Sequence, residues 1–253
     1  MCPFANHYYS YLVAIYLLDY SMAKKIVVLV RTLNEDQNID RFCQSYRWAD
    51  EIIIADGGSE DDTVSKARTY SNTYVYHFPD KLASMKGTIN PRGKHINFLI
   101  DRGIEHKADY LIFDDCDCVP SLELQRYGRA ILETVEDGMV FVNRMFVLGQ
   151  AEWFPKMTSE QSLWAWKSDV HIKADETSYT ISMDIPKVNT LRLEYPMALL
   201  HYFYPDEETL QRKKAQYVQT GEVLEDYSPR DQFGVIEPLP EWAIWRPNAK
   251  RGS

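Results

Sequence analysis

The sequence is short of basic residues and of cysteine. Its 253 residues carry 28 Lys and Arg against 37 Asp and Glu, a net charge of −9, which argues against a broad nonspecific surface for nucleic acid but leaves room for a local basic groove. The four cysteines show no paired zinc-finger spacing, and a chain of this size with 45% hydrophobic residues does not need disulfides. No internal repeat or low-complexity linker is present. These deficits favour an ordinary globular protein in a reducing cytoplasm, and an acidic enzyme for anions would need a metal or local basic side chains.

The chain also lacks a basic leader before its apolar N-terminal stretch. Residues 8–20 are apolar and aromatic, but the stretch is too short and too interrupted for a transmembrane helix. Residues 1–21 are therefore expected to be an extension of unassigned role. A peripheral amphipathic segment that contacts a membrane and a dispensable segment both stay open.

Strand-like and helix-like periods alternate along the first part of the chain, which predicts a mostly parallel sheet with helices on its faces. Strands are expected at residues 26–30, 51–55, 73–78 and 139–148 and in a run that ends at Asp114; helices are expected after Asn34, after residue 63, at 94–105 and at 122–136. In the helix at 94–105, the spacing predicts that Ile96, Leu99, Ile100 and Ile104 face inward. After residue 148 the sequence becomes aromatic and irregular.

The most informative run is Tyr110-Leu-Ile-Phe113, which reads as a buried strand and stops at Asp114, Asp115 and Asp117. Ligands of open α/β sheets bind outside the carboxyl ends of the strands, so these carboxylates are expected at the mouth of a site. Hard oxygen ligands at this density predict a divalent cation that carries phosphate.

Three motifs in order resemble a known family. They are Val30-Arg-Thr-Leu-Asn-Glu35, Ile54-Ala-Asp-Gly-Gly-Ser-Glu-Asp-Asp-Thr63 and Asp115-Cys-Asp117. Each is weak alone, but in this order and spacing they resemble the family 2 glycosyltransferases of the GT-A fold. Gln150-Ala-Glu-Trp-Phe-Pro155 and Leu199-Leu-His-Tyr202 further resemble the branch that includes lipopolysaccharide-core glycosyltransferases.

The resemblance covers residues 26–222, most of the chain. It implies a GT-A-type, Rossmann-like α/β fold whose mostly parallel sheet is flanked by helices, with an irregular, aromatic-rich acceptor region. Residues 22–148 would form the nucleotide-sugar-binding half. Residues 149–253 would form the acceptor-binding half with a C-terminal helix and tail.

For the donor nucleotide, the resemblance implies that Asp56 accepts a hydrogen bond from the base. Asp56 closes a strand on a Gly-rich turn where backbone can approach a ligand. Because Asp61, Asp62 and Thr63 can cap the following helix equally well, Asp56 is expected to be free for the ligand; a turn or cap aspartate is the alternative. Thr32 and Glu35 would line the same pocket.

For the metal, the resemblance implies that Asp117 coordinates Mg²⁺ or Mn²⁺ and that Asp115 contacts it through water or holds the ribose. The ion would neutralise charge on the departing diphosphate. His201 matches the family histidine that approaches metal or diphosphate from the far side; a core histidine bonded to backbone is the alternative. Asp114 stands where the family is often apolar, so the register could differ by one, and a solvated acidic loop is the alternative for the whole motif.

Basic residues near the expected site could bind the diphosphate. Arg92 and Lys94 precede a helix whose N-terminus attracts anions, and a solvated basic turn is the alternative. Lys213 and Lys214, beyond His201, could add phosphate contacts or face water.

Inverting transfer needs a base for the acceptor hydroxyl. In the resembling branch an acidic residue precedes the Leu-Leu-His histidine, and its counterpart is Asp184, 17 positions before His201. The branch's usual His-Glu pair is replaced here by Met183-Asp184, so Asp175, Glu176 and Glu152 remain candidates. Four aromatic residues could stack on sugar rings or simply pack in the core: Trp153, Phe154, Trp164 and Trp166.

Two other classes stay open. The run Phe113-Asp-Asp-Cys-Asp-Cys-Val119 also fits the nucleophile motif of haloacid-dehalogenase-like phosphatases, in which the first aspartate attacks phosphorus. That motif usually lies on the first strand, whereas three strands precede it here, and a later Asp-Asp pair is missing. A non-catalytic nucleotide- or sugar-binding module is the other class, since fold alone does not establish activity.

The sequence thus predicts a metal-dependent, inverting, hexosyltransferase-like enzyme that uses Mn²⁺ or Mg²⁺ and a nucleotide-sugar donor, with a UDP-sugar expected. The acceptor is a hydroxyl, and a glycan or lipid-linked glycan is favoured. A protein, a small molecule and a modified nucleobase stay open as acceptors, and the sequence does not indicate an oligomeric state.

Overall fold

Strand β1 (Ile26–Thr32) lies inside the sheet and is apolar on both faces. Its first five residues are fully buried, which is typical of a parallel strand with helices on both sides. It pairs in parallel with β2 (Glu51–Asp56) and β4 (Tyr110–Asp115), and β2 pairs in parallel with β3 (Thr73–His77). The structure is a computed structural model that describes residues 23–78, 91–149, 152–153, 161–176, 183–204 and 237–243.

The remaining strands extend this sheet beyond β4. Strand β8 (Gln161–Lys167) lies antiparallel between β4 and β6 (Met139–Leu148), which gives the order β13-β7-β6-β8-β4-β1-β2-β3. Strand β12 (Ala198–Tyr204) runs parallel to β6 and antiparallel to β5 (Cys118–Pro120). The short strands are β7 (Glu152–Trp153), β11 (Thr190–Arg192), β13 (Glu237–Pro238) and a separate pair, β9 (Lys173–Ala174) with β10 (Met183–Asp184). The region after residue 148, expected to be irregular, thus returns repeatedly to the same sheet.

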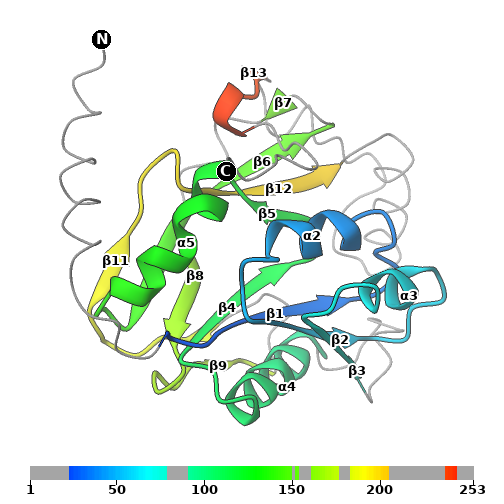
Figure 1. The fold of residues 1–253 in the computed structure, drawn as a ribbon, viewed down its shortest axis with the longest axis horizontal. Helices are drawn as coiled ribbons and strands as arrows, with labels where there is room; N and C mark the ends of the chain where they lie inside the picture. Colours follow the sequence, from blue (N-terminus) through cyan, green and yellow to red (C-terminus); the bar gives the residue numbers. More distant parts are fainter. Residues whose placement is uncertain are drawn as a thin grey trace.

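Helices cover both faces of the sheet. They are α2 (Ile39–Ser45), α3 (Thr63–Ala67), α4 (Pro91–Glu105) and α5 (Leu122–Thr134), with a 3-10 turn, η2 (Glu241–Ala243). Val28 of β1 belongs to the core with Phe42 of α2 and Leu124 of α5. Leu29 faces the opposite way, into the core with Leu99 of α4. Figure 1 shows α4 on one side of the sheet and α2 and α5 on the other, so the fold has three layers.

Helix α4 shows how far apolar spacing predicts burial. Ile96, Leu99 and Ile100 are buried as expected, but Ile104 is 46% exposed, so its inward prediction was wrong. The last turn faces the sheet through Gly103, where an added Cβ would lie 2.4 Å from Leu111 Cδ2. Residue 104 belongs to the same helical stripe as residues 96, 99, 100 and 103 but lies at its edge, and in the last turn the side chain at this edge is left exposed.

None of the helices in the described ranges is long and apolar enough to cross a membrane. The expected extension at residues 1–21 lies outside the described residues. Cys43, Cys116 and Cys118 are buried free thiols.

His95 of α4 is completely buried beneath the end of β2. Its Nε2 bonds the Ala55 carbonyl oxygen at 2.8 Å, and its ring stacks on Phe78 with centroids 4.1 Å apart. Burial lowers the pKa of His95 from 6.5 to about 4. Between about pH 6.5 and 4 the imidazole is protonated in the unfolded chain but neutral in the folded one. The free energy of unfolding therefore falls as the pH is lowered through this range, by up to about 3 kcal/mol for this group.

Replacing His95 with Gln is expected to remove this contribution, because an amide can donate to Ala55 without titrating. Urea denaturation at about pH 7 and pH 4.5 should show that acidification costs the variant about 2 kcal/mol less than the wild type. The raised pKa of Asp114 acts in the opposite direction over part of this range, but it is present in both proteins and cancels in the difference. Equal pH dependence in the two proteins would contradict the prediction.

Candidate functional site

Three parallel strands end at one edge of the sheet and bring the predicted motifs together. The register pairs Thr32 at the end of β1 with Asp56 at the end of β2, and Arg31 with Asp115 at the end of β4. Directly after β4, a turn that contains Asp117 leads into β5. The edge expected to hold ligands therefore carries the ends of all three motifs.

The loops after β1 and β2 are bound to each other by hydrogen bonds. The Asn34 side-chain oxygen accepts from the Glu60 amide at 2.9 Å, and Ser59 Oγ accepts from the Asn34 amide at 2.9 Å. Thr63 Oγ1 accepts from the Glu35 amide at 2.7 Å. Gly58 has a φ of +96°, which a residue with a side chain adopts only with strain. The two motifs thus form one fixed floor at the edge of the sheet.

Asp56 holds this floor together. Its Oδ1 accepts from Thr32 Oγ1 at 3.0 Å and from Ser59 Oγ at 2.5 Å, and its Oδ2 accepts from the Gly58 and Ser59 amides at 2.9 Å each. The carboxylate is buried, and four donors match its accepting capacity. The expected freedom of Asp56 is therefore not observed, and contact with a base would require a donor such as Ser59 to rotate away.

Asp61 rather than Asp62 accepts a backbone amide at the start of α3, and the Asp62 side chain accepts only from Ser65 Oγ among the described residues, at 3.3 Å. Asp61 Oδ1 accepts from the Thr63 amide at 3.0 Å and from Thr63 Oγ1 at 2.5 Å. Asp62 is the N-cap residue but makes no side-chain cap bond.

Asp114 lies in the core and not at the mouth of the site. It is fully buried, accepts from Tyr46 Oη at 2.9 Å and from the Asp115 amide at 3.0 Å, and lies 3.7 Å from Arg144 Nη2. Burial raises the pKa of Asp114 to about 6, although Arg144 opposes the shift. The expectation that all three carboxylates point into a site is wrong for Asp114, because its side chain takes the core face of β4.

Asp115 is paired with arginine. Arg31 Nε and Nη2 donate to its Oδ1 at 3.1 and 3.0 Å, and Arg144 Nη1 lies 4.0 Å from its Oδ2. Burial alone would raise the pKa of Asp115, but the two guanidinium groups outweigh it and hold the pKa below its ordinary value. Asp115 is therefore an anion at neutral pH that already has counter-charges.

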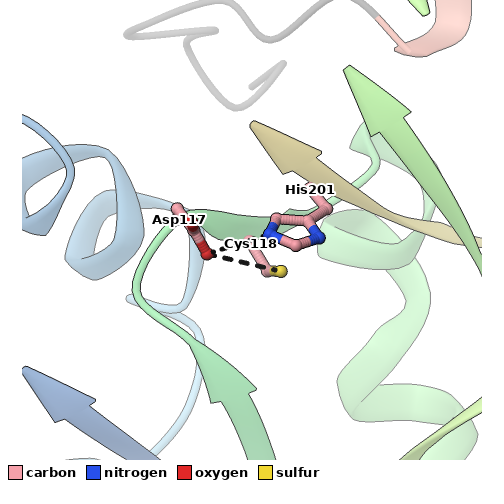
Figure 2. Close-up of side chains that lie close together, drawn as sticks. All are labelled: Asp117, Cys118 and His201. Atoms are coloured by element: carbon pink, nitrogen blue, oxygen red, sulfur yellow. Dashed lines mark hydrogen bonds and ion pairs between the residues drawn. The ribbon is translucent and has the colours of Figure 1, made fainter. Parts of the chain in front are cut away.

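Asp117 and His201, both expected near the metal, lie side by side at the sheet edge. Asp117 Oδ1 lies 3.3 Å from His201 Nε2 and 3.9 Å from Cys118 Sγ. The ligand atoms of these three residues all lie within 4.8 Å of one another, and Figure 2 shows their side chains pointing toward one another. A carboxylate, an imidazole and a thiol in such a group could hold a divalent cation. Asp115 is not a member of this group, so its metal contact stays a prediction.

The first turn of α4 lies at the same edge, because His95 is bound to the end of β2. Lys94 is exposed there, and the N-terminus of this 15-residue helix favours anions. The side chain of Arg92 lies outside the described residues, as do Lys213 and Lys214. The diphosphate roles of Arg92 and Lys94 stay predictions.

Three of the four base candidates lie on the β9–β10 segment beside α4. Asn97 Nδ2 donates to the Ala174 carbonyl oxygen at 3.0 Å and to Glu176 Oε1 at 2.8 Å. Asp175 is exposed, and its carbonyl oxygen approaches Gly93 at the start of α4. This contact places Asp175 and Glu176 toward the edge that carries the site.

Asp184 lies further from that edge. It is exposed and pairs with Lys173 in the β9–β10 ladder. Lys173 precedes Ala174, the residue whose backbone is hydrogen-bonded to the Asn97 side chain. Glu152 is exposed on β7.

Gly93 allows the base candidates to approach α4. A Cβ at this position would lie 2.1 Å from the Asp175 carbonyl oxygen and 2.9 Å from Glu176 Cα, and backbone cannot rotate away as a side chain could. Gly93→Ala is expected to cost about 1–3 kcal/mol of unfolding free energy, measured by urea denaturation, and to speed proteolysis of the 173–184 segment. Wild-type stability and wild-type cleavage in the variant would show that this contact does not form.

Of the four aromatic residues considered for sugar stacking, two lie in the core and the side chains of the other two lie outside the described residues. Trp164 and Trp166 are buried in the two cores on opposite faces of the sheet, so the packing alternative is correct for them and stacking on a sugar is excluded. The Trp153 side chain and Phe154 lie outside the described residues.

Three residues at the site were missed by the sequence analysis. Arg31 and Arg144 supply the counter-charges of Asp114 and Asp115, and Cys118 stands beside His201. Arg31 could have been noticed, because a charged residue inside an apolar strand needs a partner. No local signal identifies the partners of Arg144 or Cys118, because these depend on strand pairing.

No protein-family model matches the sequence. Among solved structures, S. aureus TarS matches 79% of this chain with a TM-score of 0.52 and 16% identity, and the match covers 41% of TarS. The TarS 1-349 fragment matches 77% of this chain and 65% of the fragment, with a TM-score of 0.50 and 16% identity. The fold is of the GT-A type. The chain spans less than two thirds of either TarS chain, and the likeness concerns the GT-A fold alone.

A third solved structure matches with lower similarity. Glucosyl-3-phosphoglycerate synthase from Mycobacterium tuberculosis, in complex with Mn²⁺ and uridine-diphosphate-glucose, matches 78% of this chain and 79% of that chain, with a TM-score of 0.45 and 14% identity.

Proposed function

We propose that the protein is a metal-dependent glycosyltransferase that moves a sugar from a nucleotide-sugar donor to a hydroxyl acceptor. One observation carries the proposal: Asp117 and His201 meet at 3.3 Å at the ligand-binding edge of a GT-A fold. A motif aspartate and a distant histidine were expected to serve one cation, and they lie side by side.

The donor would lie along the sheet edge. Asp117 and His201 would hold Mn²⁺ or Mg²⁺, which would supply charge neutralisation for the departing diphosphate. Asp115 would contact the ion through water or hold the ribose while Arg31 fixes its orientation. The floor of Thr32, Glu35 and Asp56 would take the base, for which we propose uracil, and α4 with Arg92 and Lys94 would face the diphosphate.

The acceptor hydroxyl needs a base as it attacks the anomeric carbon with inversion. Among the candidates on the β9–β10 segment, we place Asp175 and Glu176 ahead of Asp184. Asp175 lies near Gly93 at the first turn of α4, whereas Asp184 pairs with Lys173 further from the edge. Asp184 remains the counterpart by resemblance.

The division at residue 148 would concern ligands and not separate folding units. Residues 22–148 would bind the nucleotide sugar, and residues 149–253 would bind the acceptor. Strands β8 and β12 of the second part pair with β4, β5 and β6 of the first. The resemblance to the lipopolysaccharide-core branch supports a glycan or lipid-linked glycan acceptor and a hexosyl donor, and the buried free thiols support a cytoplasmic location.

The environment of Asp115 argues against the phosphatase alternative. In that mechanism the first aspartate of the motif attacks phosphorus, but Asp115 is held by two Arg31 nitrogens at 3.0 and 3.1 Å. A nucleophile needs a carboxylate oxygen directed at the substrate, and the strand order also differs from the expected first-strand position.

A thermal-shift panel tests the donor. Nucleoside diphosphates and nucleotide sugars, each with and without Mn²⁺, should raise the melting temperature only for one base and more strongly with metal, because a ligand of the folded state stabilises it by mass action. A ligand at about 100 times its dissociation constant adds about 2.7 kcal/mol. No stabilisation by any nucleotide would overturn the proposal, and binding without transfer to any acceptor would favour the binding-module alternative.

A further inference from the structure

Cys118 and His201 form a cross-strand pair beside Asp117. The antiparallel register of β5 and β12 places Cys118 directly opposite His201, and opposite residues project from the same face of a sheet with adjacent side chains. Asp117 precedes β5 and turns its carboxylate toward both. Backbone pairing therefore fixes the neighbourhood of the thiol and the imidazole.

The separations suit a shared cation. With metal–sulfur bonds of about 2.3 Å and metal–nitrogen or metal–oxygen bonds of about 2.0 Å, tetrahedral ligands lie about 3.3 Å (N to O) and about 3.5 Å (S to O) apart. The observed separations are 3.3 Å between His201 Nε2 and Asp117 Oδ1 and 3.9 Å between Cys118 Sγ and Asp117 Oδ1. The third pair, Cys118 Sγ and the His201 ring nitrogen, lies within 4.8 Å, so a closure of up to about one ångström would bring all three atoms onto one ion.

The surroundings of Cys118 differ from those of the other described thiols. Cys43 and Cys116 are members of a hydrophobic core, where a thiol packs as a small apolar group. Cys118 is equally buried but belongs to none of the hydrophobic clusters of the described residues. It faces the Asp117 carboxylate instead. Packing explains the first two thiols and not the third.

We propose that Cys118 is a protein ligand of the cation held by Asp117 and His201, and that its thiolate increases the preference of the site for Zn²⁺ over Mn²⁺ and Mg²⁺. The proposal rests on the metal site of the proposed function but not on transfer activity. Thiolate sulfur selects borderline-soft ions, whereas Mg²⁺ prefers oxygen ligands. The Cys118 proton passes to solvent as the sulfur–metal bond forms.

Cobalt spectroscopy on the full chain tests the proposal. Metal-free protein titrated with Co²⁺ should develop a near-ultraviolet thiolate-to-cobalt charge-transfer band, and Zn²⁺ should displace the cobalt at lower concentration than Mn²⁺ or Mg²⁺. In Cys118→Ser the band should disappear and Zn²⁺ affinity should fall at least about tenfold. The matched control is Cys116→Ser, a buried thiol in the turn directly before β5 that is not a member of the group. Cys116→Ser, Cys43→Ser and Cys2→Ser should all keep the band.

Each outcome decides a separate part of the proposal. Cobalt binding without a thiolate band in the wild type would overturn the role of Cys118 and leave the Asp117–His201 site intact. A band that persists in Cys118→Ser, or that is lost in Cys116→Ser, would also overturn it. Absence of cobalt binding would overturn this proposal and the metal dependence of the proposed function together. If Cys118→Ser does not fold, the wild-type spectrum with the three other cysteine variants decides the matter.

Discussion

Asp117→Asn is expected to reduce sugar transfer at least about 100-fold, since changes even to the residues that support metal ligands cost 10–100-fold. The amide removes the negative charge that Asp117 offers beside His201 at 3.3 Å. Donor binding should lose its dependence on Mn²⁺, measured by calorimetry with and without the ion. The free energy of unfolding should change little, because the neutral amide is easier to bury than the carboxylate it replaces.

The matched control is Asp62→Asn, the same chemical change at an exposed carboxylate that makes no cap bond. It should leave both rate and donor affinity within about twofold of the wild type, as surface substitutions usually have small effects. Equal metal-dependent donor affinity in wild type and Asp117→Asn would rule out Asp117 as a metal ligand.

Arg144→Gln is expected to destabilise the protein by about 3 kcal/mol, measured by urea denaturation near pH 7. Arg144 Nη2 lies 3.7 Å from the fully buried Asp114, and Nη1 lies 4.0 Å from Asp115. Burial already raises the pKa of Asp114 to about 6 against the influence of Arg144. Without Arg144 the pKa of Asp114 should rise further, and the ionised carboxylate would lose the guanidinium that lies beside it in the core.

Two further variants separate this effect from general loss of an arginine. Arg126→Gln removes a side chain that is 65% exposed and 3.9 Å from Glu123, and it should cost less than about 0.5 kcal/mol. Asp114→Asn combined with Arg144→Gln should recover at least about 1 kcal/mol relative to the sum of the single changes. Strict additivity would show that the pair does not interact.

Local apolar runs predicted the strands and helices of the first half well. Strand β1 was expected at residues 26–30 and occupies Ile26–Thr32, and β6 was expected at residues 139–148 and occupies Met139–Leu148. Such runs carry their own periodicity. Strand β8 was missed because its pairing with β6 shifts register at Trp164, so Trp164 and Trp166 point into cores on opposite faces. A strand buried on both sides shows no alternation.

Site residues that belong to a sequence motif could be predicted. Site residues whose position depends on which strands pair could not. Asp117 and His201 could be matched to family positions, and the structure brings them together. The pairing of Cys118 with His201 depends on the register of β5 and β12, which no local pattern encodes. Asp56 was identified as important, but its four internal bonds depend on how two loops meet.

The insertion of β8 between β4 and β6 has a consequence for synthesis on the ribosome. Strands β1, β2 and β4 can associate as soon as they emerge, but one side of β4 has no neighbour until residues 161–167 arrive. During that interval the nascent chain presents an apolar strand with unpaired amides and carbonyls, which is the kind of edge that recruits other chains. His201 is translated later still, so the proposed Asp117–His201 site can form only after β12 has paired with β5.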